Sequence, residues 1–576
     1  MIRSRLLLLT SVLFLAACAE DAAESGAGED VDLVDSGSGD ADNSDTADTG
    51  GSGEDADSSD ATDDSGEDSG SGDPDAVDAD TSDTTDTTDT TDTTDTTDTT
   101  DTTDTTVAPD TDPPAPPSCD SWLECESGQG CTAGACGGCA VGADCPDLLG
   151  CTAEATCGAC SADSECRAGE GCVEGVCLPA AISEVRLTIL PADFRALRAD
   201  PYDKALVFPC TVAADGIAYA GPSTLAVHGG SSRDLPKLSF LVETAAAEHP
   251  GYAEKMILRA EYNDASSLRN LLGLELFRRS TNLPTPRARF RRLYINDAFY
   301  GLMLEVERIG TNFLDVRGRD TSTSMYESDP PNAIASFGAG ALVPLDDPAL
   351  YAQAYDQKTG SVTGAADLIY FIEEVLAADY YEGQLTGNFL NRTRRQLHLD
   401  GYIGYLATNA VLQNKDHVRK NFYLSRQVVN GRIGWEFYPW DVDLTQGCLY
   451  GMLGDSSICG PAVYDDLPTN GVIEPDAGLT YPTDGFYNLL MHNVQADEFG
   501  GGASYRAEIC ARIASPLYTD GIPTLARTLG AYIRPALVED TADRNETAAD
   551  HAAAVEEVVG FYAERAAFLN EELGCP

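Results

Sequence analysis

The spacing of the cysteines is the feature that most limits how this chain can fold. Twelve of its 18 cysteines lie between Cys119 and Cys177. They form three repeats of about 20 residues, each with four cysteines and a glycine directly before the third one. A unit this short buries too little apolar surface to fold without cross-links. We therefore expect two disulfides in each repeat and an oxidising compartment.

Four cysteines allow three pairings within a repeat, of which we expect first to third and second to fourth. Zinc is the alternative, but the C-x2-C pairs that zinc sites favour occur only at the joints between repeats, at Cys136/Cys139 and Cys157/Cys160. The block 119–177 serves either as a stiff stalk or as a binding module for a wall, matrix or partner protein. The sequence leaves both functions open.

The remaining cysteines lie far apart in the chain. We expect Cys448 to pair with Cys459 and Cys510 to pair with Cys575. Cys210 is then expected to have no disulfide partner.

The N-terminus has the organisation of an export signal. Arg3 and Arg5 precede an apolar run from Leu6 to Ala17, which is too short to span a bilayer. The run ends in L-A-A-C at Cys18, which resembles a bacterial lipobox. Residues 1–18 are therefore predicted to be a lipoprotein signal peptide with Cys18 lipidated. The alternative is an ordinary signal peptide with a chance cysteine.

Residues 19–118 form an acidic segment of Asp, Ser, Thr, Gly and Ala. They hold 33 of the 95 acidic residues and no Lys or Arg, and they include eight consecutive D-T-T units from Asp83 to Thr106. Such a composition cannot bury enough apolar surface to offset the entropy of ordering the chain. We expect a disordered tether between the membrane anchor and the folded part.

The folded part is only moderately acidic, because residues 178–576 hold 52 acidic and 33 basic residues. No segment carries the basic face that a nucleic-acid-binding protein needs. Nucleic acid is therefore excluded as an expected partner.

The region 180–576 is predicted to be a single α+β domain, with strands first and helices after. Gly-rich turns separate the strand-like runs, and Asn296-Asp297 marks a hairpin turn. Strands are expected near 185–190, 205–208, 223–227, 238–242, 290–295 and 300–306. Helices are expected near 266–280, 365–380, 383–396, 399–414, 502–515, 521–535 and 547–572. This order favours a two-lobe layout with a β-rich N-lobe and a helical C-lobe.

One stretch carries the spacing that phosphoryl transfer uses. Asp416 is followed by Asn421 at D-x4-N, and Asp441 and Asp443 come after an aromatic, strand-like run. In such sites one carboxylate orients the attacking hydroxyl, while an amide and a second carboxylate hold Mg²⁺. The spacing alone also fits an exposed acidic turn beside a buried strand.

Five segments of the region 180–576 resemble the CotH kinase family. They are H-G-G-S-S-R-D-L-P-K-L-S-F (228–240), N-D-A-S-S-L-R-N (263–270), R-L-Y-I-N-D-A-F-Y-G-L-M-L-E-V-E (292–307), N-K-D-H-V-R-K-N-F-Y-L (414–424) and P-W-D-V-D-L-T-Q-G (439–447). They occur in family order over roughly residues 183–520. The resemblance implies an atypical protein-kinase-like fold and use of ATP with Mg²⁺ or Mn²⁺.

The resemblance also implies roles for single residues. Asp416 is the expected base or orienter of the substrate hydroxyl. Asn421 and Asp441 are the expected metal ligands, with Asp443 supporting them. Lys237 is expected to reach the nucleotide phosphates.

The turn before Lys237 is also expected to bind the nucleotide phosphates. Backbone N–H groups of Gly229, Ser231 and Ser232 can bind phosphate oxygens. Glu307 is expected either to contact the adenine side or to pair with Lys237, and Glu275 is a rival partner for this lysine.

The leading interpretation is an exported, lipid-anchored kinase that transfers the γ-phosphoryl group of ATP to Ser or Thr of secreted or surface proteins. It would work in the bacterial cell envelope, on the periplasmic or cell-surface side. The alternatives are a non-catalytic assembly or adhesion protein on a kinase-like fold, and a nucleotidyl transferase.

Overall fold

The computed structural model describes residues 118–576 except 246–248, 250, 331–338, 378–379, 382–383, 386–388, 415–416, 418–419, 451–456, 460–489, 491–493, 495–500 and 541–546. The predicted signal peptide with Cys18, the acidic tether up to residue 117, and Asp416 lie outside the described residues. Among the helices that are described, none is both long and apolar enough to cross a bilayer.

Each cysteine repeat is a short 3-10 turn followed by a two-stranded hairpin. The hairpins are β1 (Gly130–Thr132) with β2 (Ala135–Gly137), β3 (Gly150–Cys151) with β4 (Cys157–Gly158), and β5 (Glu170–Val173) with β6 (Val176–Pro179). The predicted first-to-third and second-to-fourth connectivity is confirmed in every repeat. The bridges are Cys119–Cys131, Cys125–Cys136, Cys139–Cys151, Cys145–Cys157, Cys160–Cys172 and Cys166–Cys177.

The other cysteines also follow the expectation. Cys510 and Cys575 form a disulfide, and Cys210 is free and buried. Cys448 is disulfide-bonded, and it lies opposite Cys459 in the pair β20 (Cys448–Tyr450) and β21 (Ser457–Cys459).

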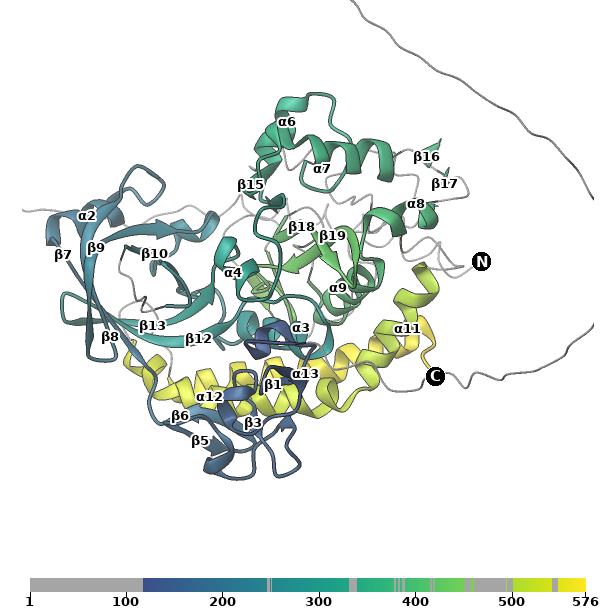
Figure 1. The fold of residues 1–576 in the computed structure, drawn as a ribbon. Helices are drawn as coiled ribbons and strands as arrows, with labels where there is room; N and C mark the ends of the chain where they lie inside the picture. The colour runs from purple at the N-terminus through teal and green to yellow at the C-terminus, as the bar shows by residue number, and fades with distance from the viewer. Residues whose placement is uncertain are drawn as a thin grey trace, which may run out of the picture. The chain divides into compact units, whose positions relative to one another are not determined.

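The β-rich part closes into a seven-stranded barrel of order β10-β11-β13-β12-β7-β8-β9 (Figure 1). Its pairs are antiparallel except β12 with β7. Asn296 and Asp297 form the predicted turn between β12 and β13, and both have positive φ, as a tight hairpin requires. The strands are β7 (Glu184–Ile189), β8 (Phe208–Ala214), β9 (Ile217–His228), β10 (Ser239–Thr244), β11 (Lys255–Arg259), β12 (Ala288–Ile295) and β13 (Ala298–Glu307).

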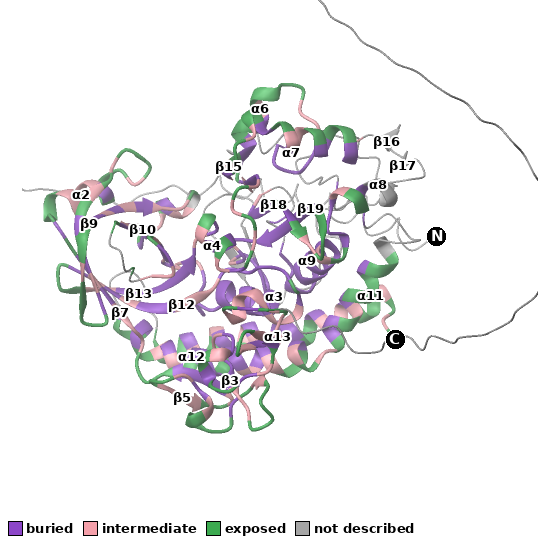
Figure 2. Cartoon of the chain, in the orientation of Figure 1, coloured by how far each residue is buried: buried purple, intermediate pink, exposed green. Residues whose placement is uncertain are grey.

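Alternation along the strands gives the barrel two apolar surfaces. Met256 and Leu258 of β11 belong to the core inside the barrel, whereas Ile257 between them belongs to the main core outside it. Neighbouring residues of a strand point to opposite faces, so one strand serves both cores. The outer face of β11, β12 and β13 is therefore packed against the rest of the domain, whereas much of β8 and β9 is exposed (Figure 2).

The sequence pattern predicted strands first and helices after, but the second half of the domain also contains strands. A second sheet has the order β15-β14-β18-β19, and two of its strands come from the polar region 317–363. They have four and five residues and pair at long range, so they leave no local periodicity. The strands are β14 (Met325–Ser328), β15 (Tyr355–Thr359), β18 (Phe422–Val429) and β19 (Arg432–Pro439).

The helices pack around the second sheet and along the outside of the barrel. Figure 1 shows α12 and α13 running along the lower side of the domain, beneath the barrel and the second sheet. The longer ones match the predicted ranges within a few residues, and the mixed helix and strand content is confirmed. The helices are α2 (Pro191–Ala199), α3 (Arg269–Ser280), α4 (Thr311–Asp315), α6 (Pro348–Ala354), α7 (Ala366–Tyr370), α8 (Phe389–Gln396), α9 (Leu399–Leu412), α11 (Gly501–Ala514), α12 (Ile522–Glu539) and α13 (Ala548–Leu573).

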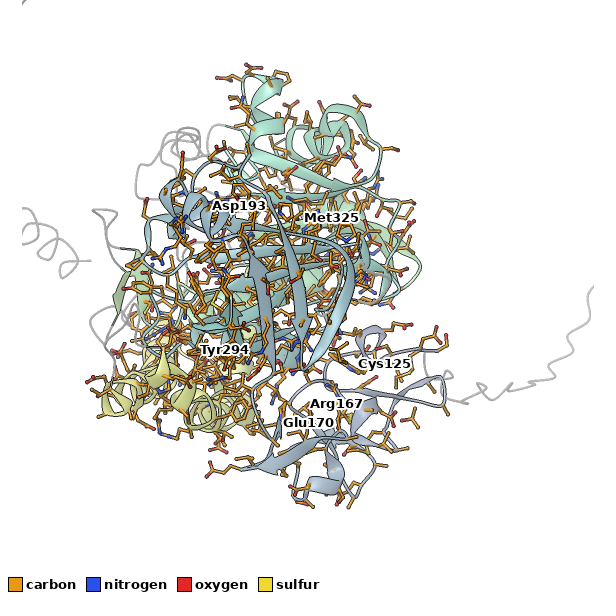
Figure 3. All side chains as sticks on the ribbon, turned by 90° about the vertical axis from the view of Figure 1, so that its left-hand side faces the viewer. Cys125, Arg167, Glu170, Asp193, Tyr294 and Met325 are labelled. Carbon is orange, nitrogen blue, oxygen red and sulfur yellow. A yellow bond between two sulfur atoms is a disulfide. The ribbon has the colours of Figure 1, made fainter. Side chains whose placement is uncertain are left out.

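The cysteine repeats pack on the large domain. The third repeat contributes Val176 and Leu178 to the main core, together with Leu271 of α3. Figure 3 shows Arg167 and Glu170 of this block below the barrel strands. The repeats are therefore part of the folded body, which disagrees with a stalk.

Arg278 of α3 joins the first two repeats to the domain. Its guanidinium donates to the carbonyl of Asp147 at 3.0 Å and lies 5.8 Å from the ring centre of Trp122. Its own carbonyl accepts a hydrogen bond from the Ser127 hydroxyl at 2.5 Å. Glu275, one helical turn away, neutralises the charge of Arg278.

Candidate active site

A cavity of about 480 Å³ lies between the barrel and the second sheet. The barrel contributes the ends of β9 and β11 and the loop before β10, and the other side is formed by β14, β15 and the ends of the β18–β19 hairpin. Five residues predicted for the site line this cavity: Gly229, Ser232, Asn421, Asp441 and Asp443. The structure therefore brings together most of the described site residues.

The loop after β9 has a conformation that needs glycine. Gly229 has φ +109°, and a Cβ there would lie 2.3 Å from the Ser232 hydroxyl. Arg233 holds the loop, because its guanidinium donates to the carbonyls of Val227 at 2.9 Å and Gly229 at 2.5 Å. Ser231 lies in this loop, within the 3-10 turn Ser231–Asp234.

A local hairpin brings Asn421 and Asp441 together. Phe422 of β18 pairs with Pro439 of β19, so the residues before β18 and after β19 lie at the same end of the ladder. Asn421 has φ +61° and Asp441 has φ +55°, a region that Asn and Asp tolerate better than most residues. The backbone N–H of Asn421 donates to the carbonyl of Ser328 at 2.9 Å, which ties this end to β14.

Arg259, at the end of β11, joins the carboxylates of the cavity. Its Nη1 lies 2.5 Å from Asp441 Oδ1, and its Nη2 lies 3.0 Å from Asp443 Oδ2. Its Nε lies 2.9 Å from Glu261 Oε1. One guanidinium therefore meets three carboxylates, and it links the barrel to the loop after β19.

These charges shift the pKa values of their neighbours. Burial would raise the pKa of Asp441, but Arg259 and Lys420 outweigh it, so the pKa lies below its usual value. Burial and the positive charge of Arg259 lower the pKa of His228 to about 4. Near neutral pH, Asp441 is therefore ionised and His228 is an uncharged imidazole.

Lys237 lies deeper than the predicted role requires. It is 3% exposed, and its ammonium group pairs with Asp540, the residue after α12, and donates to the carbonyl of Leu302 at 2.7 Å. Asp540 also accepts from the backbone N–H of Leu302 at 3.1 Å. The glycine at 301 leaves the necessary space, since a Cβ there would lie 2.7 Å from Lys237 Cε.

The two glutamates proposed as partners of Lys237 have other partners. Glu307 pairs with Arg287 at 2.9 Å and with Arg317 at 2.6 Å. Glu275 pairs with Arg278 and Arg279 of its own helix. The carboxylate that holds Lys237 is Asp540, which lies 303 residues further along the chain.

The metal prediction fits the described residues in part. Asn421, Asp441 and Asp443 line one cavity and offer the oxygen ligands that Mg²⁺ prefers. Within the described residues, however, the only groups of three or more His, Cys, Asp or Glu close enough to share an ion are disulfide-bonded cysteines. A divalent cation at Asp441 would thus need the amide of Asn421, water or substrate oxygens as further ligands.

Several charged residues of the cavity were not foreseen from the sequence. Glu327 and Asp329 come from β14 and the residue after it, and Lys358 comes from β15. Lys358 pairs with Glu327 at 2.5 Å. The spacing of residues in the sequence did not reveal them, because they lie on or directly after the two short strands that the sequence pattern missed.

The buried Glu307 gives a prediction on stability. Burial would raise its pKa, but Arg317 and Arg287 outweigh burial and lower it from 4.5 to about 2. A lowered pKa stabilises the fold above the unfolded value of 4.5, and this stabilisation is lost as the pH falls towards 2. Glu307→Gln is expected to lower the free energy of unfolding by about 3 kcal/mol near neutral pH. Urea unfolding at about pH 7 and about pH 3 should show the difference from wild type shrinking at the lower pH. A difference that stays constant with pH would contradict this assignment.

Comparison with known proteins places the chain in a family. The family model described as CotH kinase protein matches residues 225–569. The chain belongs to the CotH family. The chain is also 26% identical to inner spore coat protein H of Bacillus subtilis (strain 168) over 265 residues, which is 46% of this chain and 68% of that protein. The predicted resemblance to CotH proteins is confirmed.

The CotH match begins within β9 and ends within α13. It contains the cavity lining from Ala226 to Leu444, and also Asp540, but not the lining residues between 203 and 207. It extends further towards the C-terminus than the five motifs did. Membership of the CotH family suggests a kinase-like protein.

Proposed function

We propose that this CotH protein is an exported, metal-dependent kinase that transfers the γ-phosphoryl group of ATP to Ser or Thr of secreted or surface proteins. The observation that supports it is the meeting of Gly229, Asn421, Asp441 and Asp443 around one cavity. In this proposal the barrel is the N-lobe, and the second sheet with its helices is the C-lobe. A volume of about 480 Å³ is in the range of small-molecule sites.

In the proposed mechanism each residue has a separate task. Asp416 orients the substrate hydroxyl and takes its proton as the oxygen attacks the γ-phosphorus. The bond between the γ-phosphorus and the bridging oxygen breaks, and ADP leaves. Asn421 and Asp441, with Asp443, would hold a Mg²⁺ or Mn²⁺ ion, whose charge would offset that of the phosphates.

The phosphates are proposed to lie against the loop after β9. Backbone N–H groups at Gly229, Ser231 and Ser232 are the proposed donors. Lys237 can add its charge only if its pair with Asp540 opens, because the ammonium group is buried. Glu307, held by two arginines, supports the barrel wall in this scheme.

We propose the bacterial cell envelope as the place of action, with the chain anchored through a lipid on Cys18. Disulfides at every cysteine of the three repeats fit an oxidising compartment. The relative from Bacillus subtilis is named as a spore coat protein, which also fits a surface location. Nucleic acid is not among the proposed partners.

The test is phosphoryl transfer by the full chain. Wild type with γ-labelled ATP, Mn²⁺ or Mg²⁺ and a surface-protein extract is expected to label protein. Asp416→Asn and Asp441→Asn are expected to reduce the rate by roughly 10²–10⁴-fold, because base and metal ligand are lost. Asn is suited to position 441, where φ is +55°, so the fold should persist.

The control is Asp193→Asn, which changes a partly exposed carboxylate in the first turn of α2, outside the cavity lining, and should leave transfer unchanged. Intact-mass analysis of a labelled substrate distinguishes an added phosphoryl group from an added nucleotidyl group. Transfer that persists in Asp416→Asn would overturn the proposed base.

One observation favours a non-catalytic assembly protein instead. Lys237, Asp441 and Asp443 are all neutralised by partners within the protein. A thermal melt with ATP and Mn²⁺ separates the two functions, since a ligand that binds only the folded state raises the melting temperature. No shift in the presence of both would favour the assembly protein.

A further inference from the structure

The position of Arg259 has a consequence for how the site takes up a cation. Its two terminal nitrogens lie on one oxygen each of Asp441 and Asp443, at 2.5 and 3.0 Å. These are the carboxylates assigned to the metal in the proposed function. The guanidinium therefore holds one oxygen of each carboxylate that the proposed function assigns to the metal.

Arg259 is held in this place by more than the two aspartates. Its third contact, from Nε to Glu261, lies at 2.9 Å, and Glu261 is itself 3% exposed and accepts from Asn270 at 2.9 Å. The side chain of Arg259 is 14% exposed, while those of Asp441 and Asp443 are 27% and 30% exposed. The carboxylates thus remain open to solvent on one side, and the arginine lies behind them.

A metal ion bound to the oxygens that Arg259 holds would lie close to the guanidinium. Mg²⁺ binds carboxylate oxygen at about 2.1 Å. An ion at that distance from Asp441 Oδ1 would lie within about 5 Å of the Nη1 nitrogen, and two cations at this distance repel each other. Binding of the ion and the ion pairs of Arg259 therefore weaken each other.

We propose that Arg259 is the resident counter-charge of Asp441 and Asp443 and competes with the divalent cation for them. The inference rests on the proposed function, because it takes these carboxylates as metal ligands. Without nucleotide, the site is neutralised by Arg259 and binds a cation weakly. The cation binds more tightly when it arrives with nucleotide phosphates, because they provide further oxygen ligands and negative charge. Arg259 thus couples loading of the metal to loading of the nucleotide.

The test measures Mn²⁺ binding by the full chain without nucleotide, from the electron paramagnetic resonance signal of free Mn²⁺. Arg259→Gln removes the competing charge and keeps a polar side chain. It is expected to bind Mn²⁺ about tenfold more tightly than wild type, because the two aspartates lose their counter-charge. Equal or weaker binding in a folded Arg259→Gln variant would overturn the proposal.

Two further variants locate the effect. Arg186→Gln removes the same charge from an ion pair with Glu184 on β7 and is expected to leave Mn²⁺ binding unchanged. Adding Asp441→Asn to Arg259→Gln is expected to abolish the gain. A gain that survives in the double variant would place the ion elsewhere and overturn the proposal.

A folding defect in Arg259→Gln would not end the test. Arg259→Lys keeps one positive charge but cannot donate to two carboxylates with the geometry of a guanidinium. It is expected to bind Mn²⁺ several-fold more tightly than wild type, and unchanged affinity would count against the competition. If wild type transfers phosphate while no Arg259 variant changes Mn²⁺ affinity, this inference fails and the proposed function stands. If wild type neither binds Mn²⁺ with ATP nor transfers phosphate, the proposed function fails.

Discussion

Lys237→Met is expected to lower the free energy of unfolding by about 3–5 kcal/mol, because it leaves a buried carboxylate without its counter-charge. Asp540 is 6% exposed, and its second carboxylate oxygen has no hydrogen-bond partner among the residues that the structure describes. The contacts seen for Asp540 Oδ2 are the Lys237 ammonium group and the backbone N–H of Leu302. In Lys237→Met only the second of these donors would remain. Urea unfolding of the full chain, followed by circular dichroism, measures the effect.

The double variant Lys237→Met with Asp540→Asn separates stability from function. Both charges disappear together, and the amide introduced at position 540 can still accept from Leu302. The double variant is expected to recover most of the stability, to within about 2 kcal/mol of wild type. Loss of phosphoryl transfer in this stable variant would show that Lys237 acts on the nucleotide. Retained transfer would show that the pair only holds α12 to the barrel.

The outcome that contradicts the first prediction is a Lys237→Met variant within about 1 kcal/mol of wild type, which is the range of an exposed ion pair. It would mean that the lysine and Asp540 are not shielded from water in solution.

Loss of the Cys166–Cys177 bridge is expected to destabilise the large domain as well as its own repeat. Closing a loop of this length stabilises a chain by roughly 3 kcal/mol. Val176 and Leu178 flank Cys177 and belong to the main core of the domain. Without the bridge, Cys166→Ser/Cys177→Ser should loosen this strand and expose apolar core surface.

The first repeat provides a matched control. Cys125–Cys136 spans the same separation of 11 residues, so its removal changes chain entropy by the same amount. Its repeat meets the domain through the polar contacts of Ser127 and Arg278. Calorimetry of the full chain should therefore show the transition of the CotH domain shifted to lower temperature in the third-repeat variant and little changed in the first-repeat variant. Equal shifts in the two variants would contradict the assignment of the third repeat to the core.

The cysteine repeats could be predicted in detail because each one is closed locally. Every bridge joins cysteines 11 or 12 residues apart, so the repeat limits the possible pairings to three within each unit. Spacing could not show where the repeats pack. That was decided by Val176 and Leu178, two apolar residues whose burial needs a surface from elsewhere in the chain.

The same division applies to the candidate site. The motifs of the sequence predicted Asn421 and Asp441 as ligands of one ion, and the β18–β19 hairpin of the structure brings them to the same end of a ladder. Only the tertiary structure chose Arg259 for Asp441 and Asp540 for Lys237. Lys237 and Asp540 lie 303 residues apart, and a chain with 95 acidic residues offers many candidate partners for a lysine. Turns and hairpins form between residues that are close in the sequence, so the spacing of residues can predict them. An ion pair between distant residues forms only where the packing of the barrel and helices brings opposite charges together, which the sequence does not reveal.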